Sequence, residues 1–290
     1  MSANTHHKAS VFSFLFSNPD ALRELYCAIE GIDLPPDTPV GINTLSDVLY
    51  MGKINDISFT IGSRLVVLIE HQSTVNRNMP LRLLMYIAHV YEKIADRKKL
   101  YQRGLEKIPE PEFIVLYNGA DPYPDRSVLR LSEAFMDASG LRCAPRAPAL
   151  ELEVQVYNIN QGRNAAILAK SATLNGYSTF IDRVRENRKT MPLETAMKDA
   201  VKYCIDHNVL KPFFETHSSE VFNMLLTEWN MEDAIAYNRE EAREEGREEG
   251  RVENRAQTAQ TALAEGLSVE VIQKITGLDL DAIRDIQARG

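Results

Sequence analysis

Two neighbouring apolar segments, each interrupted by a carboxylate, constrain the fold of this chain most strongly. The segments are residues 54–61 and 65–72. The first contains Asp56 and the second Glu70. A charge buried among apolar side chains costs free energy unless it has a partner. Because only three residues separate the segments, we predict a β-hairpin whose carboxylates need a common partner, most simply a metal ion.

The length of the hairpin loop decides whether these carboxylates meet. Successive side chains of a strand point to opposite faces. A three-residue loop pairs Asp56 with Glu70, with their side chains about 5 Å apart, close enough to share a divalent cation. A two-residue loop of Gly62 and Ser63 instead pairs Asp56 with Ile69 and places Glu70 on the opposite face. A shared metal therefore requires the longer loop or a bulge.

The same residues carry a resemblance to a known family. Asp56 followed by Glu70-His71-Gln72 resembles the core of the PD-(D/E)xK nucleases. With the run Pro-Leu-Arg-Leu-Leu-Met-Tyr at 80–86, the chain is similar more narrowly to the recombination-promoting nuclease and putative transposase family. The similarity extends from residues 12–16 to the tail rich in Arg, Glu and Gly.

The resemblance implies an α/β fold with a mixed sheet flanked by helices, and a metal-dependent DNA endonuclease acting in recombination or surviving from a mobile element. It assigns Asp56 and Glu70 as ligands of Mg²⁺ or Mn²⁺ and Gln72 as the residue that orients the attacking water. The main-chain carbonyl of His71 and a helix carboxylate such as Glu24 would complete the metal site.

Gln72 also supports an alternative. It stands where the wider superfamily usually has lysine, and a neutral amide can orient water but lends it no positive charge. The alternative is a catalytically silent DNA- or protein-binding module that retains the nuclease fold.

Net charge argues against a nucleic-acid partner. The chain has 33 basic and 41 acidic residues and a formal charge of −8, whereas non-specific DNA-binding proteins are often strongly basic. Basic clusters at residues 97–103 and 183–189 end predicted helices, where the helix dipole also favours them. An acidic site awaiting a cation would contribute to the imbalance, so the charge weakens the DNA assignment without overturning it.

The remaining composition fits a cytoplasmic protein. We find no apolar run of signal-peptide or membrane-span length. The three cysteines, Cys27, Cys143 and Cys204, are far apart and form no Cys-x-x-Cys pair, which predicts buried thiols rather than disulfides or a zinc ribbon. His207 and His217 have no carboxylate at ligand spacing, so we assign them packing or surface roles.

Capping residues, helix-ending residues and the spacing of apolar side chains predict the helices around the hairpin. Two short helices open the chain, the second beginning after the pair Asn18-Pro19 and ending at Gly31. After a strand near residues 44–50 and the hairpin, Asn78 caps a long helix with Pro80 in its first turn. The predicted apolar stripe of that helix comprises Leu84, Ile87, Ala88, Tyr91, Ile94 and Ala95.

A second stripe on the long helix contains Arg82, Tyr86, His89 and Lys93. It could face solvent or a catalytic groove, and we assign His89 and Lys93 to solvent. For Arg82 and Tyr86 the family resemblance makes groove contacts an equal alternative.

The second half of the chain is predicted to be mainly helical. Strands are expected at residues 113–117 and 150–157, and helices over 164–229. Strands followed by helices indicate an α/β core with a helical covering layer. The first domain is therefore residues 1–238.

The C-terminal part is predicted to be a charged linker and a helical hairpin. Residues 239–256 repeat Arg, Glu and Gly with almost no apolar side chain, which predicts a linker of marginal helicity because glycine costs about 1 kcal/mol relative to alanine. In residues 257–290, Ser268 and Asp279 cap two helices and Gly277 ends the first. Their slightly acidic surface favours self-association or docking over DNA reading.

Overall fold

The computed structural model describes residues 10–43, 56–71, 76–136 and 147–289. The chain divides into two compact units, residues 1–229 and 230–290. Residues 44–50, where a strand was predicted, lie outside the described residues, as do Gln72 and Cys143. None of the helices in the described part is long and apolar enough to cross a membrane.

A six-stranded mixed sheet forms the centre of the first unit, in the order β1-β2-β3-β4-β6-β5. The strands are β1 (Val40–Asn43), β2 (Asp56–Ile61), β3 (Arg64–His71), β4 (Glu110–Tyr117), β5 (Arg126–Arg130) and β6 (Glu153–Asn158). Strands β1, β2 and β3 pair antiparallel, whereas β3, β4 and β6 run parallel and β5 is an antiparallel edge. The predicted α/β class is confirmed.

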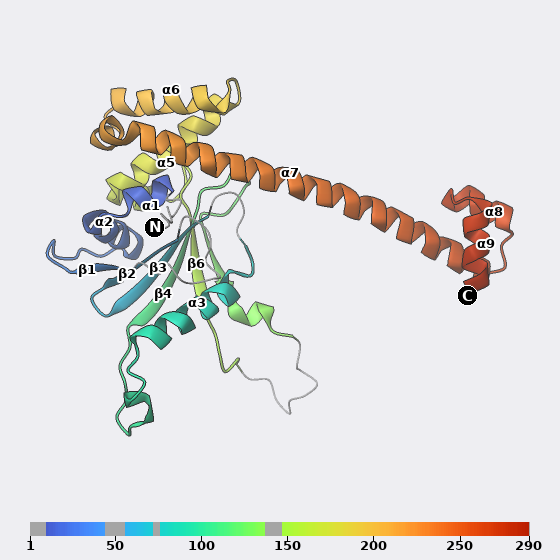
Figure 1. Ribbon diagram of the computed structural model, residues 1–290, viewed down its shortest axis with the longest axis horizontal. Coiled ribbons are helices and arrows are strands. Elements are labelled where there is room, and N and C mark those ends of the chain that lie inside the picture. Colours follow the sequence, from blue (N-terminus) through green and yellow to red (C-terminus); the bar gives the residue numbers. More distant parts are fainter. Residues whose placement is uncertain (1–9, 44–55, 72–75, 137–146, 290) are drawn as a thin grey trace, which may run out of the picture. The chain divides into compact units, whose positions relative to one another are not determined.

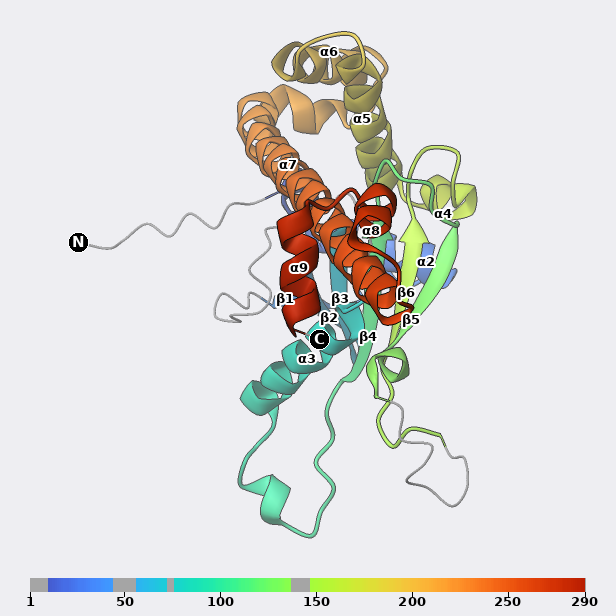
Figure 2. The same ribbon diagram turned by 90° about the vertical axis from the view of Figure 1, so that its right-hand side faces the viewer.

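Helices cover both faces of this sheet (Figures 1 and 2). One face packs against α3 (Met79–Ile94), and the other against a layer of α1 (Val11–Leu15), α2 (Pro19–Glu30), α4 (Ala165–Lys170) and α5 (Ala172–Arg188). Alternation along β4 explains the two cores. Val115 and Tyr117 join the α3 side, while Ile114 and Leu116 join the other.

Helix α2 begins at Pro19, one residue before the predicted start, and ends at Gly31 as predicted. The Oδ1 atom of Asn18 accepts a hydrogen bond of 2.8 Å from the Asp20 N–H, and Pro19 occupies the first helical position. Gly31 ends the helix with φ of 71°, a left-handed conformation that glycine adopts readily.

Helix α3 also lies where predicted, but the expected capping is wrong and the predicted apolar stripe is only partly right: Leu84, Ile87 and Tyr91 pack in the core, whereas Ala88 and Ile94 are exposed. Asn78 precedes it without a side-chain capping hydrogen bond. The buried residues are Met79, Pro80, Leu83, Tyr86, Ile87 and Val90. Ile94 is 50% exposed, and Leu84 is only partly buried. Apolar residues occur almost all round this helix, so periodicity alone identified only part of the face that packs against the sheet.

The later elements differ from prediction mainly at strand edges. Strand β5 was not predicted, because its sequence Arg-Ser-Val-Leu-Arg is short and polar at both ends. Strand β6 begins at Glu153, and Leu150 is 47% exposed. The predicted helical region is confirmed and continues through α6 (Leu193–Asp206) into α7 (Lys211–Ala264).

The second unit is a small helical core. It contains the end of α7, α8 (Val269–Thr276) and α9 (Leu280–Arg289), joined by Ala259, Ala262, Ile272 and Ile283. Gly277 ends α8 with φ of 69°, and Asp279 Oδ1 accepts a hydrogen bond of 2.7 Å from the Ala282 N–H. Residues 239–256 are helical within α7, so the helicity of the repeat is greater than predicted.

Candidate functional site

The β2–β3 hairpin has the shorter of the two loops considered from the sequence. Ile61 pairs with Arg64 across Gly62 and Ser63, so Asp56 pairs with Ile69 and not with Glu70. Gly62 has φ of 58°. Glycine adopts this conformation without steric cost, and it is favoured at the first position of two-residue hairpin loops.

The predicted pairing of Asp56 with Glu70 is therefore wrong. The two positions are offset by one residue in the backbone register, and a one-residue offset exchanges the faces of the sheet. This register does not fit a cation bound directly between two facing carboxylates. Among the described residues, no group of three or more His, Cys, Asp or Glu side chains is arranged to hold a metal ion.

Glu70 and His71 nevertheless lie at the carboxyl end of a parallel strand in the sheet. They are the last residues of β3, and their backbone positions pair with Leu116 and Tyr117 of parallel β4. Tyr117 in turn pairs with Asn158, the last residue of β6. In α/β sheets, ligands bind outside the carboxyl ends of parallel strands. The motif thus ends at the sheet edge where a ligand site is expected.

Glu24, the weakest of the predicted ligands, has a structural contact. Its Oε1 atom accepts a hydrogen bond of 3.2 Å from the main-chain N–H of Thr173, in the first turn of α5. A carboxylate at a helix N-terminus is favoured by the helix dipole. Glu24 therefore joins α2 to α5, and this contact accounts for a carboxylate at that position without a metal.

The two predicted groove residues on α3 differ in accessibility. Tyr86 is 3% exposed and belongs to the core between α3 and the sheet, so it does not face solvent, and its groove contact stays a prediction. Its ring packs on the face of α3 that contacts the sheet, whereas the sequence pattern placed Tyr86 on the second stripe of that helix. Arg82, one turn earlier, is half-buried, and its groove contact stays a prediction.

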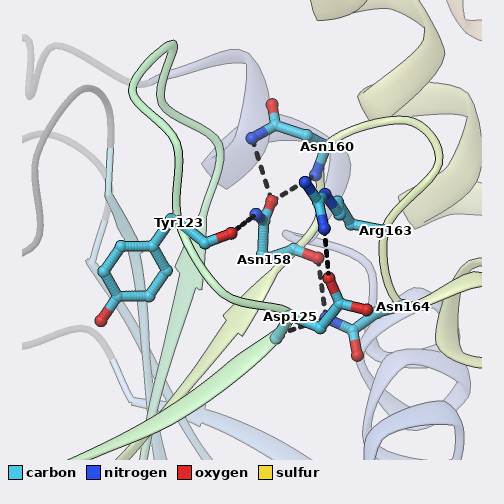
Figure 3. Close-up of polar contacts among 6 residues, drawn as sticks. All are labelled: Tyr123, Asp125, Asn158, Asn160, Arg163 and Asn164. Carbon is cyan, nitrogen blue, oxygen red and sulfur yellow. Dashed lines mark hydrogen bonds and ion pairs between the residues drawn. The ribbon is translucent and has the colours of Figure 1, made fainter.

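A network of asparagine side chains fills the edge beyond β4 and β6 (Figure 3). Asn158 Nδ2 donates to the carbonyl of Tyr123 at 2.9 Å, and its Oδ1 accepts from Asn160 Nδ2 at 3.0 Å. Arg163 Nη1 forms an ion pair of 3.1 Å with Asp125 Oδ1. Asn164 Nδ2 donates to the Asn158 carbonyl at 2.8 Å. These contacts join the loop after β4 to the loop after β6.

Arg185 of α5 forms hydrogen bonds at the same edge of the sheet. Its Nη1 atom donates to Asn118 Oδ1 at 3.1 Å and to Asn160 Oδ1 at 2.9 Å, and its Nη2 donates to the Asn118 carbonyl. Asn118 is 2% exposed, and its Nδ2 is buried without a hydrogen-bond partner among the described residues. Arg185 therefore holds the ends of β4 and β6 together beside the end of β3.

Sequence reasoning did not identify this network. Asn118 comes directly after the predicted strand at residues 113–117 and was assigned no role there beyond a turn, and Arg185 was interpreted only as part of a basic helix end. Other members of that basic cluster also have structural contacts. The Arg183 guanidinium lies 3.8 Å from the Tyr203 ring centroid, and Lys189 forms an ion pair of 2.6 Å with Glu186. The sequence did contain one indication of a polar network at this edge, because Asn118, Asn158 and Asn160 follow the two predicted strands.

Comparison with known proteins supports the resemblance drawn from the sequence. The model of the family described as "Putative transposase, YhgA-like" matches residues 42–164. Searches of curated proteins and of solved structures gave no match. The matched range contains the hairpin, α3 and the asparagines that follow β4 and β6. Over residues 42–164, the chain is thus similar to the YhgA-like putative transposase family.

Proposed function

We propose that this protein is a DNA endonuclease of the transposase-related type, which hydrolyses phosphodiester bonds at the carboxyl edge of β3, β4 and β6. The observation that carries the proposal is the family match, because its range includes Asp56 and the Glu70-His71-Gln72 motif. A transposase-related protein acts on DNA, so DNA is the proposed partner.

The position of the motif supports the choice of site. Glu70 and His71 end β3 next to Tyr117 of β4, and the Arg185 network fixes the neighbouring strand ends. Rigid strand ends can hold catalytic groups in a reproducible geometry. In this proposal, Glu70 and Gln72 act on the scissile phosphate and its attacking water, and Arg185 positions the adjacent loops.

Dependence on Mg²⁺ or Mn²⁺ is proposed from the family resemblance alone. Such an ion would lower the pKa of bound water and neutralise charge on the phosphate. The hairpin register argues against direct sharing of the ion by Asp56 and Glu70. The PD-(D/E)xK core likewise belongs to the proposal, supported by the mixed sheet with α3 between parallel strands β3 and β4.

The second candidate is a DNA-binding module that keeps the fold but does not cleave, and the hairpin register favours it. One experiment separates the two. Supercoiled plasmid is incubated with the protein in Mg²⁺, Mn²⁺ or EDTA, and binding of a labelled fragment is measured in parallel. Cleavage that requires a metal and is lost in Glu70→Ala supports the endonuclease. Binding without cleavage supports the silent module.

A further inference from the structure

The segment between α3 and β4 differs in charge from the rest of the chain. Residues 96–108, here named the α3–β4 arm, contain five basic side chains and two acidic ones, whereas the whole chain carries −8. The basic residues are Arg97, Lys98, Lys99, Arg103 and Lys107. The arm extends from the end of α3 and the beginning of β4 (Figures 1 and 2). It is therefore a local positive surface on an acidic protein.

Only some of these charges are neutralised within the protein. Arg97 forms an ion pair of 2.7 Å with Glu92, and Lys99 one of 3.3 Å with Glu106. Within the described ranges, the side chains of Lys98, Arg103 and Lys107 form no ion pair or hydrogen bond, and all three residues are exposed. Three cations are thus available to an anionic partner.

The arm also exposes apolar side chains among its charges. Tyr101 is 93% exposed, Leu105 80% and Leu100 59%. Apolar side chains gathered at one place on a surface indicate a site that a partner covers. An aromatic ring between unpaired cations is the combination that binds unpaired nucleic acid, because bases stack on the ring while the cations contact phosphates.

The base of the arm is held in place. The Tyr91 hydroxyl donates a hydrogen bond of 2.7 Å to the Pro109 carbonyl across the base of the arm. At its start, Asp96 Oδ1 accepts from the Lys98 N–H at 2.9 Å. The short helix η1 (Lys99–Tyr101) follows. These contacts hold the base and the start of the arm and leave the side chains of Lys98, Arg103 and Lys107 exposed.

We propose that the α3–β4 arm binds single-stranded DNA, with Tyr101 stacking on a base and Lys98, Arg103 and Lys107 contacting phosphates. The arm joins the amino end of β4, which is eight residues long, so about 26 Å of strand separates it from the carboxyl edge. The inference rests on the proposed function only in taking DNA as the partner, and it requires no cleavage.

The test measures binding of a fluorescent oligonucleotide of about 20 nucleotides to the full-length protein in EDTA over a range of salt concentrations. The arm variant is Lys98→Gln, Arg103→Gln and Lys107→Gln together. Its matched control is Lys170→Gln, Lys202→Gln and Lys274→Gln, exposed lysines outside the arm. Each phosphate contact in single-stranded DNA contributes about 0.7 to the slope of log affinity against log salt. We expect the magnitude of that slope to fall by about 2 in the arm variant, because three contacts are lost, and to change little in the control variant.

The aromatic contact is tested separately. We expect Tyr101→Ala to weaken binding about tenfold and Tyr101→Phe to retain it, because base stacking needs the ring and not the hydroxyl. Absence of binding by the wild type, or equal binding by the arm and control variants, would overturn the inference. If those variants bind equally but the wild type cleaves plasmid, the endonuclease proposal is retained and DNA binding by the arm is rejected. Arm-dependent binding without cleavage would support the arm and contradict the endonuclease.

Discussion

Arg185 on α5 donates a hydrogen bond of 3.1 Å from Nη1 to Oδ1 of Asn118, which follows β4. The contact connects the helical layer to the strand edge at which the family motif ends. A second bond from the same nitrogen to Asn160 adds the loop after β6. Loss of one side chain would thus release two loops at the candidate site.

Replacing Arg185 with methionine should destabilise the protein. Hydrogen bonds that involve a charged donor contribute about 1.5–3 kcal/mol each, and the buried Asn118 would lose its acceptor contacts. We expect the free energy of unfolding to fall by roughly 2–3 kcal/mol, measured by urea denaturation. Arg103→Met, at an exposed arginine, should change it by less than about 0.5 kcal/mol. Equal effects of the two changes would show that the network does not support the fold.

Glu112 should make stability depend on pH. Burial raises the pKa of its carboxyl, although Arg64 Nη1, 2.8 Å from Oε1, opposes the shift. The folded pKa of Glu112 therefore lies above its unfolded pKa, and between these two pH values the native state binds more protons than the unfolded state. The contribution of Glu112 to the free energy of unfolding falls as pH rises through this range. Glu112→Gln removes the titration, so its stability relative to wild type should rise with pH from about 4.5 upward. A pH-independent difference in denaturation midpoint would contradict this.

Glu24→Gln separates a structural role from a metal-binding role. Glutamine keeps an oxygen that can accept from the Thr173 N–H, so only the charge at the helix N-terminus is lost, at about 0.3–1 kcal/mol. We expect a small loss of thermal stability and unchanged metal dependence of DNA cleavage. Glu30→Gln, an exposed position on the same helix, is the control. A higher metal requirement for Glu24→Gln alone would restore Glu24 as a ligand.

A fragment of residues 1–238 should fold without the C-terminal helices. The core around Ile272 and Ile283 shares no residue with the two cores of the first unit. We expect the fragment to keep its far-ultraviolet circular dichroism per residue and its DNA cleavage, while any self-association through α8 and α9 is lost in sedimentation. Aggregation of the fragment, or a melting temperature many degrees lower than that of monomeric full-length protein, would mean that the units depend on each other.

Local patterns predicted the helices and the fold class well. Gly31 ends α2 as expected, and its start lies within one residue of the prediction, because helix ends depend on residues close in sequence. The buried face of α3 was predicted only in part and strand β5 was missed, since both depend on which element packs against them. The hairpin register depended on a difference of one residue in loop length, and both loops were compatible with the sequence.

The candidate site was predictable only in part. The family motif around Glu70 could be identified from its residues, and the family match covers it. The Arg185 network could not, because it joins residues 67 positions apart in sequence through side-chain contacts. Hydrogen bonds between distant asparagine and arginine side chains leave no periodic signal, so only the fold brings them together.

Plasmid cleavage by purified wild type, Asp56→Ala, Glu70→Ala and the exposed control Asp37→Ala is the sharpest test of the endonuclease proposal. Reactions contain Mg²⁺ or EDTA, and circular dichroism verifies that each variant is folded. We predict metal-dependent nicking or cutting by wild type and Asp37→Ala, and a loss of at least about 100-fold in the other two, the scale of a lost catalytic group. Equal cleavage by wild type and Asp56→Ala, or none by folded wild type with any metal, would contradict the proposal.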